Sequence, residues 1–117
     1  MKIMKISEFS NKFDLSYDTI RYYMNLNLIM PEKKGGYYYF NQECEKEMEE
    51  ILKLKEMEFS LQEIKEIFNF KRIGKLTSYQ RNSYYQSLYK EKINDIERKI
   101  KRLRKAKVDL EEKIADL

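Results

Sequence analysis

The N-terminal third of the chain carries two short helical patterns of apolar residues, in residues 6–13 and 16–25, joined by the short link Asp14-Leu15. On each predicted helix the apolar residues fall on one face of a 3.6-residue repeat. They are Ile6, Phe9 and Phe13 in the first pattern and Ile20, Tyr23 and Met24 in the second. Ser16 caps the second helix well, because its hydroxyl can accept a backbone N–H of the first turn. The pattern predicts a helix, a sharp turn and a capped helix.

The opposite face of the second predicted helix is polar. It holds Asp18, Arg21, Tyr22 and Asn25, which supply one cation, one phenol and two short polar groups but no large aliphatic side chain. Such a face is suited to contact a polar partner. It is typical of a helix-turn-helix motif, whose second helix can enter the DNA major groove. An ordinary helical hairpin of a small bundle would give a similar pattern, and the two interpretations stay open at this point.

The next segment predicts a buried run followed by a hairpin. Leu26–Met30 is largely apolar and is expected in the core, and Pro31 ends any helix there. Gly35-Gly36 can adopt the positive φ angles of a tight turn, and Tyr37–Phe40 favours a strand. Lys33-Lys34 then lies at the hairpin tip, which is the arrangement of a DNA-binding wing. A solvated loop with an aromatic strand packed on the core is the alternative.

Two more helices are predicted between Asn41 and Phe70. Asn41 caps the first, Ser60 and Glu63 form a capping box at the start of the second, and Phe59 can pack on Ile64 as a hydrophobic staple. The apolar stripes hold Cys44, Met48, Ile51, Leu52 and Leu54 in the first helix and Leu61, Ile64, Ile67 and Phe68 in the second. Cys44 is therefore expected to be a small core residue rather than a sensor. A connector that includes Gly74 is predicted from Phe70 to Leu76.

From Thr77 or Ser78 to the end there is no proline or glycine, and the apolar residues follow a heptad repeat. The repeat comprises Tyr89, Ile93, Ile96, Ile100, Leu103, Leu110, Ile114 and Leu117, with Lys107 as its one polar core position. Such a helix would be on the order of 60 Å long. A narrow apolar stripe needs a partner helix, most simply from a second copy of the chain. Packing back onto its own domain is the alternative.

Composition and charge narrow the function. The 117 residues suffice for one small domain with an extension, and the net charge of +4 hides segments of +2 (residues 1–40), −5 (41–70) and +7 (71–117). Histidine is absent and cysteine occurs once, which leaves little for a zinc or copper site or for a general base. No Gly-rich phosphate loop, membrane span or secretory signal is recognisable. We therefore expect no enzyme, no metal and no cofactor, and a cytoplasmic location.

These elements together resemble the MerR family of bacterial transcription regulators. The runs that carry the resemblance are Ile6-Ser7-Glu8-Phe9, Ser16-Tyr17-Asp18-Thr19-Ile20-Arg21-Tyr22-Tyr23, Leu28-Ile29-Met30-Pro31, Gly36-Tyr37 and Phe59-Ser60-Leu61-Gln62-Glu63-Ile64. The resemblance implies a mostly α fold, with a winged helix-turn-helix head (residues 1–75) and a long coiled-coil dimerisation helix (residues 76–117). It also implies a homodimer, joined through an antiparallel coiled coil, that binds double-stranded DNA. Such a dimer would distort an overlong promoter spacer so that RNA polymerase engages both promoter elements, with activation or repression left open.

We expect two sets of contact residues, one for DNA and one for the second copy of the chain. We expect DNA contacts from Ser16, Tyr17, Asp18, Thr19, Arg21, Tyr22, Lys33, Lys34 and Tyr37. Arg21 and Tyr22 would contact phosphates or base edges, and the lysines would hold the flanking backbone. We expect the dimer contact from Tyr89, Ile93, Ile96, Ile100, Leu103, Leu110 and Ile114.

The chain departs from the family pattern at three points. The wing arginine is missing from Gly36-Tyr37-Tyr38-Tyr39-Phe40, Glu58 replaces the glycine before Phe-Ser-Leu, and Met24 replaces an acidic residue. No cysteine lies in the predicted dimer helix, so a metal- or redox-sensing member is not expected. The chain is then either a minimal member or one whose sensor follows Leu117. The competing hypothesis is a coiled-coil adaptor whose head binds protein, which the acidic middle segment and the missing wing arginine favour.

Overall fold

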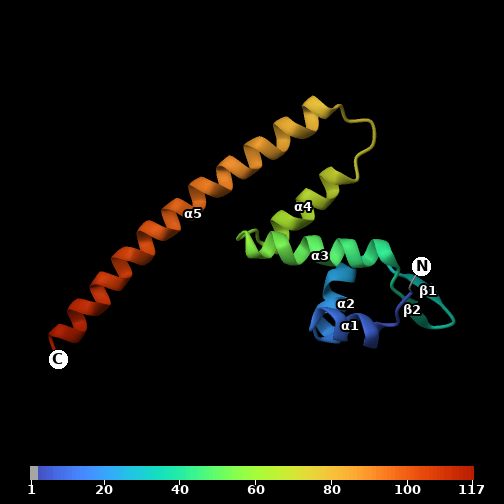
Figure 1. Ribbon diagram of the computed structural model, residues 1–117, viewed down its shortest axis with the longest axis horizontal. Helices are drawn as coiled ribbons and strands as arrows, with labels where there is room; N and C mark the ends of the chain where they lie inside the picture. The colour runs from blue at the N-terminus through green and yellow to red at the C-terminus, as the bar shows by residue number, and fades with distance from the viewer. Residues whose placement is uncertain (1–2) are drawn as a thin grey trace. The chain divides into compact units, whose positions relative to one another are not determined.

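The computed structural model describes residues 3–117, so Met1 and Lys2, with which the predicted head begins, lie outside the described residues. The chain divides into two units, Met1–Ile73 and Gly74–Leu117. The helices and strands are labelled in Figure 1. They are α1 (Ile6–Phe13), α2 (Tyr17–Asn25), β1 (Glu32–Lys34), β2 (Tyr37–Tyr39), α3 (Gln42–Glu56), α4 (Leu61–Lys71) and α5 (Ser78–Ala115).

The first unit is built around the aromatic and aliphatic side chains predicted to face inward. Phe9 of α1 and Ile20 of α2 are fully buried, and the Phe9 ring stacks on that of Phe40 with 4.4 Å between centroids. Met4 forms an isolated antiparallel bridge with Phe40, in which the two backbone N–H···O distances are 2.9 and 2.7 Å. The N-terminal residues therefore fasten the end of the hairpin to the helix pair.

The hairpin has the predicted two-residue turn. β1 and β2 are antiparallel, with Glu32 opposite Tyr39 and Lys34 opposite Tyr37. Gly35 and Gly36 have φ angles of 55° and 82°, as a type I′ turn requires at both central positions. This turn matches the twist of the flanking strands, and the short hairpin forms a wing that ends beside Met4 (Figure 1).

The caps predicted for α3 and α4 are present. The Asn41 side chain accepts the backbone N–H of Cys44 at 3.0 Å, and Ser60 and Glu63 form a complete capping box. Between the two helices Glu58 has a φ of 71°, so it keeps the left-handed conformation that glycine adopts at low cost. The side chains of Cys44 and Ile64 are both buried, as the apolar stripes predicted.

Two details of the prediction are wrong. The predicted connector starts too early, because α4 continues through Phe70 and ends at Lys71. The predicted buried run is buried only in part: Leu28 and Ile29 are 0 and 1% exposed, whereas Met30 is 56% exposed. Met30 directly precedes Pro31, which favours an extended backbone at that residue, and its side chain leaves the core where β1 begins.

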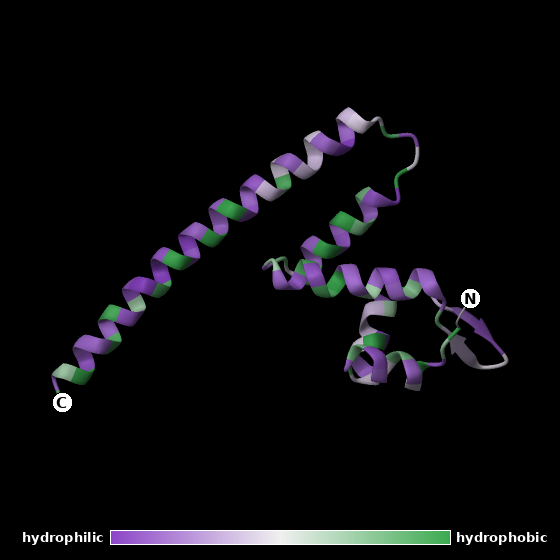
Figure 2. Cartoon of the chain, in the orientation of Figure 1, coloured by the Kyte–Doolittle hydropathy of each residue, from purple (hydrophilic) through white to green (hydrophobic). Residues whose placement is uncertain are grey.

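The second unit is dominated by α5, a helix of 38 residues and about 57 Å. Thr77 caps it, with Gln80 completing a capping box. The first turns of α5 are hydrophilic, and hydrophobic bands then recur between hydrophilic stretches to its C-terminal end (Figure 2). None of its side chains is buried in the single chain, and most of the heptad positions are more than 40% exposed: Tyr89, Ile93, Ile100, Leu103, Leu110 and Ile114. Within residues 3–117 no helix is long and apolar enough to cross a membrane.

Candidate nucleic-acid interface

The first turn of α2 is fixed by hydroxyl groups. The Ser16 Oγ accepts the backbone N–H of Thr19 at 3.1 Å and lies 2.9 Å from the Thr19 hydroxyl. This is the cap that the sequence predicted, and it satisfies one of the unpaired N–H groups at the helix start. The remaining free N–H groups and the helix dipole make this end of α2 favourable for a phosphate.

The outward face of α2 presents the polar side chains that the sequence assigned to it. Arg21 is exposed, lies 3.5 Å from the Asp18 carboxylate and has its guanidinium carbon 5.9 Å from the centre of the Tyr17 ring. Because both members of the ion pair are exposed, the pair contributes little to stability. Arg21 can therefore exchange the Asp18 carboxylate for a phosphate or a guanine edge at small cost.

Two adjacent tyrosines of α2 have opposite roles. Tyr22 is 51% exposed, whereas Tyr23 is 1% exposed and its hydroxyl accepts from the Lys55 ammonium of α3 at 3.2 Å. Tyr23 therefore anchors α2 to the rest of the head. Tyr22 is presented on the exposed face, together with Arg21.

The wing carries more positive charge than the sequence indicated. The Lys33 ammonium lies 5.3 Å from the centre of the Tyr38 ring, and Lys34 pairs with Glu32 at 3.4 Å. Lys5 comes from the start of α1, yet its ammonium lies 5.0 Å from the centre of the exposed Tyr37 ring. Sequence reasoning missed Lys5, because only the bridge between Met4 and Phe40 brings it to the wing. Lys5 adds a third ammonium group to those of Lys33 and Lys34 at the hairpin.

Arg72 is a second residue that the sequence did not single out, and it connects three parts of the head. Its guanidinium donates to the backbone carbonyls of Asn27 and Leu28, just after α2, and to the Glu47 carboxylate of α3 at 2.8 Å. Because Arg72 caps the end of α4, it joins α4 to α3 and to the segment that follows α2. No local pattern in the sequence could have indicated these contacts, since its partners lie far away along the chain.

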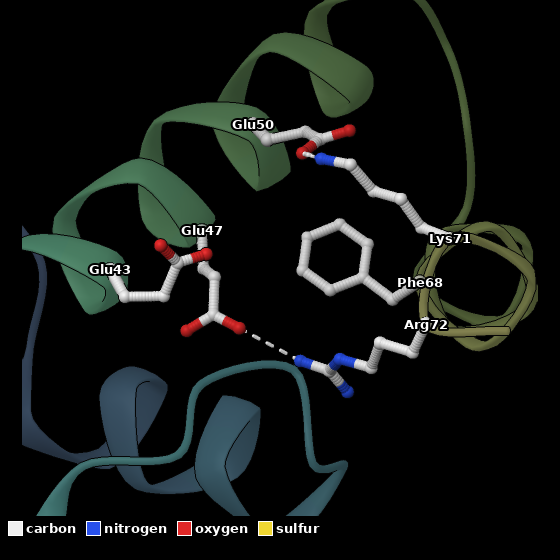
Figure 3. Close-up of a pocket in the computed structure, with 6 residues that line it drawn as sticks. All are labelled: Glu43, Glu47, Glu50, Phe68, Lys71 and Arg72. Atoms are coloured by element: carbon white, nitrogen blue, oxygen red, sulfur yellow. Dashed lines mark hydrogen bonds and ion pairs between the residues drawn. The ribbon is translucent and has the colours of Figure 1, made fainter. Parts of the chain in front are cut away.

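A shallow cavity of about 180 Å³ lies between α3 and α4, and both Arg72 and Glu47 line it (Figure 3). Lys71 pairs with Glu50, and the Phe68 ring lies between the two basic side chains, with 5.9 Å from its centre to the Lys71 ammonium and 5.4 Å to the Arg72 guanidinium carbon. Burial raises the pKa of Glu47 above its ordinary value, and the hydrogen bond and charge of Arg72 oppose that rise. The cavity is a joint between helices rather than part of the exposed α2 face.

Within residues 3–117 the structure shows no exposed thiol and no metal-binding cluster. Cys44 is 1% exposed, and burial raises the pKa of its thiol, so the thiolate is disfavoured. Among residues 3–117 no group of cysteine, aspartate and glutamate side chains is arranged to hold a metal ion. The α2 face and the wing remain as the candidate interface, and both belong to the same unit of the chain.

Comparisons with known proteins give the chain its relatives. A family model described as MerR HTH family regulatory protein matches residues 4–71, and another, described as MerR, DNA binding, matches residues 46–113. Over 114 residues the chain is 32% identical to the mercuric resistance operon regulatory protein of Bacillus cereus, covering 93% of this chain and 83% of the relative. The fold is similar to the crystal structure of a MerR-family transcriptional regulator from Bacillus cereus. That match has a TM-score of 0.78 and 21% identity, and covers 95% of this chain and 79% of that one.

Proposed function

This chain belongs to the MerR family of DNA-binding transcription regulators, and on that premise we propose that it acts as a homodimer that distorts promoter DNA. The predicted resemblance is thereby confirmed, and with it the winged helix-turn-helix head followed by a long helix. The family assignment favours the regulator over the coiled-coil adaptor. The contacts to DNA, the dimer and the distortion are the proposal.

The observation that carries the proposal is the pairing of an exposed polar face on α2 with a buried anchor on the opposite side of the same helix. Tyr23 and Ile20 are fixed in the core, so Arg21 and Tyr22 are displayed on a rigid support. Rigid display lowers the entropy lost when a side chain is ordered against a base edge. Arg21 and Tyr22 would contact bases or phosphates in the major groove, and the α2 N-terminus near Ser16 would receive a phosphate.

The wing would hold the DNA backbone beside the major groove. Three ammonium groups lie on or next to the hairpin, those of Lys33, Lys34 and Lys5. The Tyr37 side chain, whose ring lies near the Lys5 ammonium, is 61% exposed. Contacts of this kind supply affinity and register, whereas the α2 contacts supply sequence selectivity.

The proposed dimer would account for the mode of action. Two heads held by paired α5 helices would read two half-sites, so the binding site should be nearly palindromic. A dimer that fixes the distance between two recognition helices can bend or untwist the intervening DNA, at a cost that depends on its sequence. We propose that this distortion aligns the promoter elements for RNA polymerase.

Within residues 3–117 the structure offers no accessible thiolate for a mercury site. The relative's name refers to mercuric resistance. A mercury site would need accessible thiolates, whereas Cys44, which is the one cysteine of this chain, is buried with a raised pKa.

The test starts from binding-site selection with randomised duplexes, followed by titration of the selected DNA. Arg21→Ala should weaken binding by about 1–3 kcal/mol, while the thermal melt stays almost unchanged because Arg21 is exposed. Lys53→Ala removes an exposed cation from α3 and serves as the control. Unchanged affinity in Arg21→Ala, or an equal loss in Lys53→Ala, would refute the assignment of α2 as the recognition helix.

A further inference from the structure

The positive charge of the C-terminal segment is concentrated in ten residues of α5. Residues 71–117 hold 14 basic and 7 acidic side chains, and seven of the basic ones lie in residues 98–107, where no acidic side chain occurs. The remainder of the segment holds seven of each sign and is neutral in sum. Like charges three or four residues apart on a helix repel each other. A concentration of this kind therefore opposes helix stability unless an anion neutralises it.

Four of these basic side chains share one face of α5. They are Arg98, Lys101, Arg102 and Lys105, which we call the basic face; intervals of three and four residues make them neighbours on a helix. All four are exposed, and they line a shallow groove of about 380 Å³. With 3.6 residues per turn, the basic face lies on the side of α5 opposite the apolar heptad stripe. A second helix packed on that stripe would therefore leave the basic face open to solvent.

The charge of the basic face is neutralised only at one end. Arg98 pairs with Asp95 one turn earlier, and its side chain is still 69% exposed. The other three members form no ion pair within residues 3–117. The next acidic residue toward the C-terminus is Asp109, which follows the last member of the face by one turn. The basic face is thus a compact patch of exposed cations available to an external anion.

The composition of the basic face favours a phosphate backbone over a protein partner. It includes no aromatic or aliphatic residue, whereas protein interfaces have apolar anchors at their centre and few lysines. Two of its four side chains are arginines, whose planar guanidinium binds two phosphate oxygens at once. The face is about 10 Å long, and a stretch of duplex DNA of that length carries about six phosphates. Its charge and length therefore match a short stretch of nucleic-acid backbone.

We propose that the basic face of α5 binds the phosphate backbone of double-stranded DNA without reading its sequence. This contact is additional to those of α2 and the wing, because the basic face belongs to the second unit of the chain. It goes beyond the proposed function, since it requires neither a specific site nor a contact to a base edge. Its effect is to raise the affinity for all DNA alike and to keep the regulator on DNA between specific binding events.

The first test measures the salt dependence of binding to a short duplex that lacks the selected site. Lys101→Gln, Arg102→Gln and Lys105→Gln are combined in the full chain, because glutamine removes the charge and keeps a high helix propensity. The slope of log K against log salt should fall by about 2–3, since each neutralised phosphate contributes about 0.9. The charge-preserving variant Lys101→Arg, Arg102→Lys and Lys105→Arg should keep the wild-type slope. Circular dichroism and sedimentation velocity verify that the helix content and oligomeric state are unchanged.

A control of equal net charge separates the basic face from a general effect of charge. Lys53→Gln, Lys90→Gln and Lys113→Gln together remove three exposed cations outside the face, and should lower the slope by less than about 1. An equal fall in this control, or an unchanged slope in the variant of the basic face, would overturn the proposal. A basic-face variant that loses binding to vesicles of anionic phospholipid but not to the duplex would also overturn it, and would assign the face to a lipid surface.

The second test locates the contact by acetylating the lysines of the wild type with and without the same duplex, followed by mass spectrometry. Lys101 and Lys105 should be protected several-fold by DNA, whereas Lys90 and Lys113 of the same helix should react equally in both samples. The wing lysines report the contact of the head in the same spectra, so the proposed function and this inference can fail separately. Equal reactivity of Lys101 and Lys105 with and without DNA would overturn the inference, whatever the result at the wing.

Discussion

Removing the Arg72 side chain should destabilise the head and make its stability depend more strongly on pH. In Arg72→Ala the carbonyls of Asn27 and Leu28 lose their donor, and the Glu47 carboxylate loses its counter-charge. The side chains of Arg72 and Glu47 are 32 and 15% exposed, so solvent replaces these partners only in part. Loss of the hydrogen bonds from the charged guanidinium and of the partly buried ion pair should lower the free energy of unfolding by about 2–3 kcal/mol.

The pH dependence follows from Glu47. The pKa of Glu47 is already raised above its ordinary value of 4.5, mainly by burial, so protonation of Glu47 favours the folded state. The contribution of Glu47 to stability therefore falls as the pH rises above 4.5. Arg72 opposes this rise in pKa, so its removal moves the pKa of Glu47 further up. The destabilisation caused by Arg72→Ala should therefore be larger near pH 7.5 than near pH 4.5.

The assay is urea denaturation of the wild type and Arg72→Ala at both pH values and at one protein concentration. Glu47→Gln, alone and combined with Arg72→Ala, completes a double-mutant cycle, in which the pH dependence of the Arg72 effect should disappear. Lys71→Ala is the control, because its ion pair with Glu50 is more exposed and should contribute at most about 1 kcal/mol. An Arg72→Ala effect that is the same at both pH values would refute the reasoning from Glu47.

Three further predictions concern the wing, the α3–α4 turn and α5. Replacing Lys33 and Lys34 with alanine should weaken binding to all DNA sequences alike, and should reduce the slope of log K against log salt by up to about 2; an unchanged slope would exclude the wing from the interface. Glu58→Gly should raise the free energy of unfolding by about 0.5–1 kcal/mol in urea denaturation, because glycine tolerates the φ of 71°. A lower free energy of unfolding would show that the contacts of the glutamate side chain outweigh the backbone strain. Ile100→Lys with Leu103→Lys should abolish the dimer at micromolar concentration, along with specific DNA binding, while non-specific binding remains; light scattering and titration decide, and a dimer that still binds its site would contradict the interface.

The helix starts could be predicted because their causes are local. Ser16, Asn41 and Ser60 each cap a helix within three residues of their own position, so a short window of sequence contains the whole interaction. The hairpin turn is likewise local, because Gly35 and Gly36 are its two central residues. The face of α2 that points outward followed from the same short-range periodicity.

The parts that escaped prediction depend on contacts between distant segments. Arg72 reaches carbonyls more than forty residues away, and Lys5 reaches the wing only through a backbone bridge. Met30 is apolar but exposed, because the chain leaves the core between α2 and β1. Nothing within a few residues of these side chains distinguishes them from ordinary surface or core residues.

The bridge between Met4 and Phe40 also has a consequence for the order in which the head folds. It closes a loop that contains α1, α2 and the hairpin, so the bridge cannot form until Phe40 is available to pair with the first residues of the chain. Closing such a loop costs chain entropy before any contact compensates for it. The α1–α2 hairpin can form early from local contacts, whereas the wing should be fastened late and together with the Phe9–Phe40 stack. During synthesis α2 would therefore exist before the hairpin is fastened beside it.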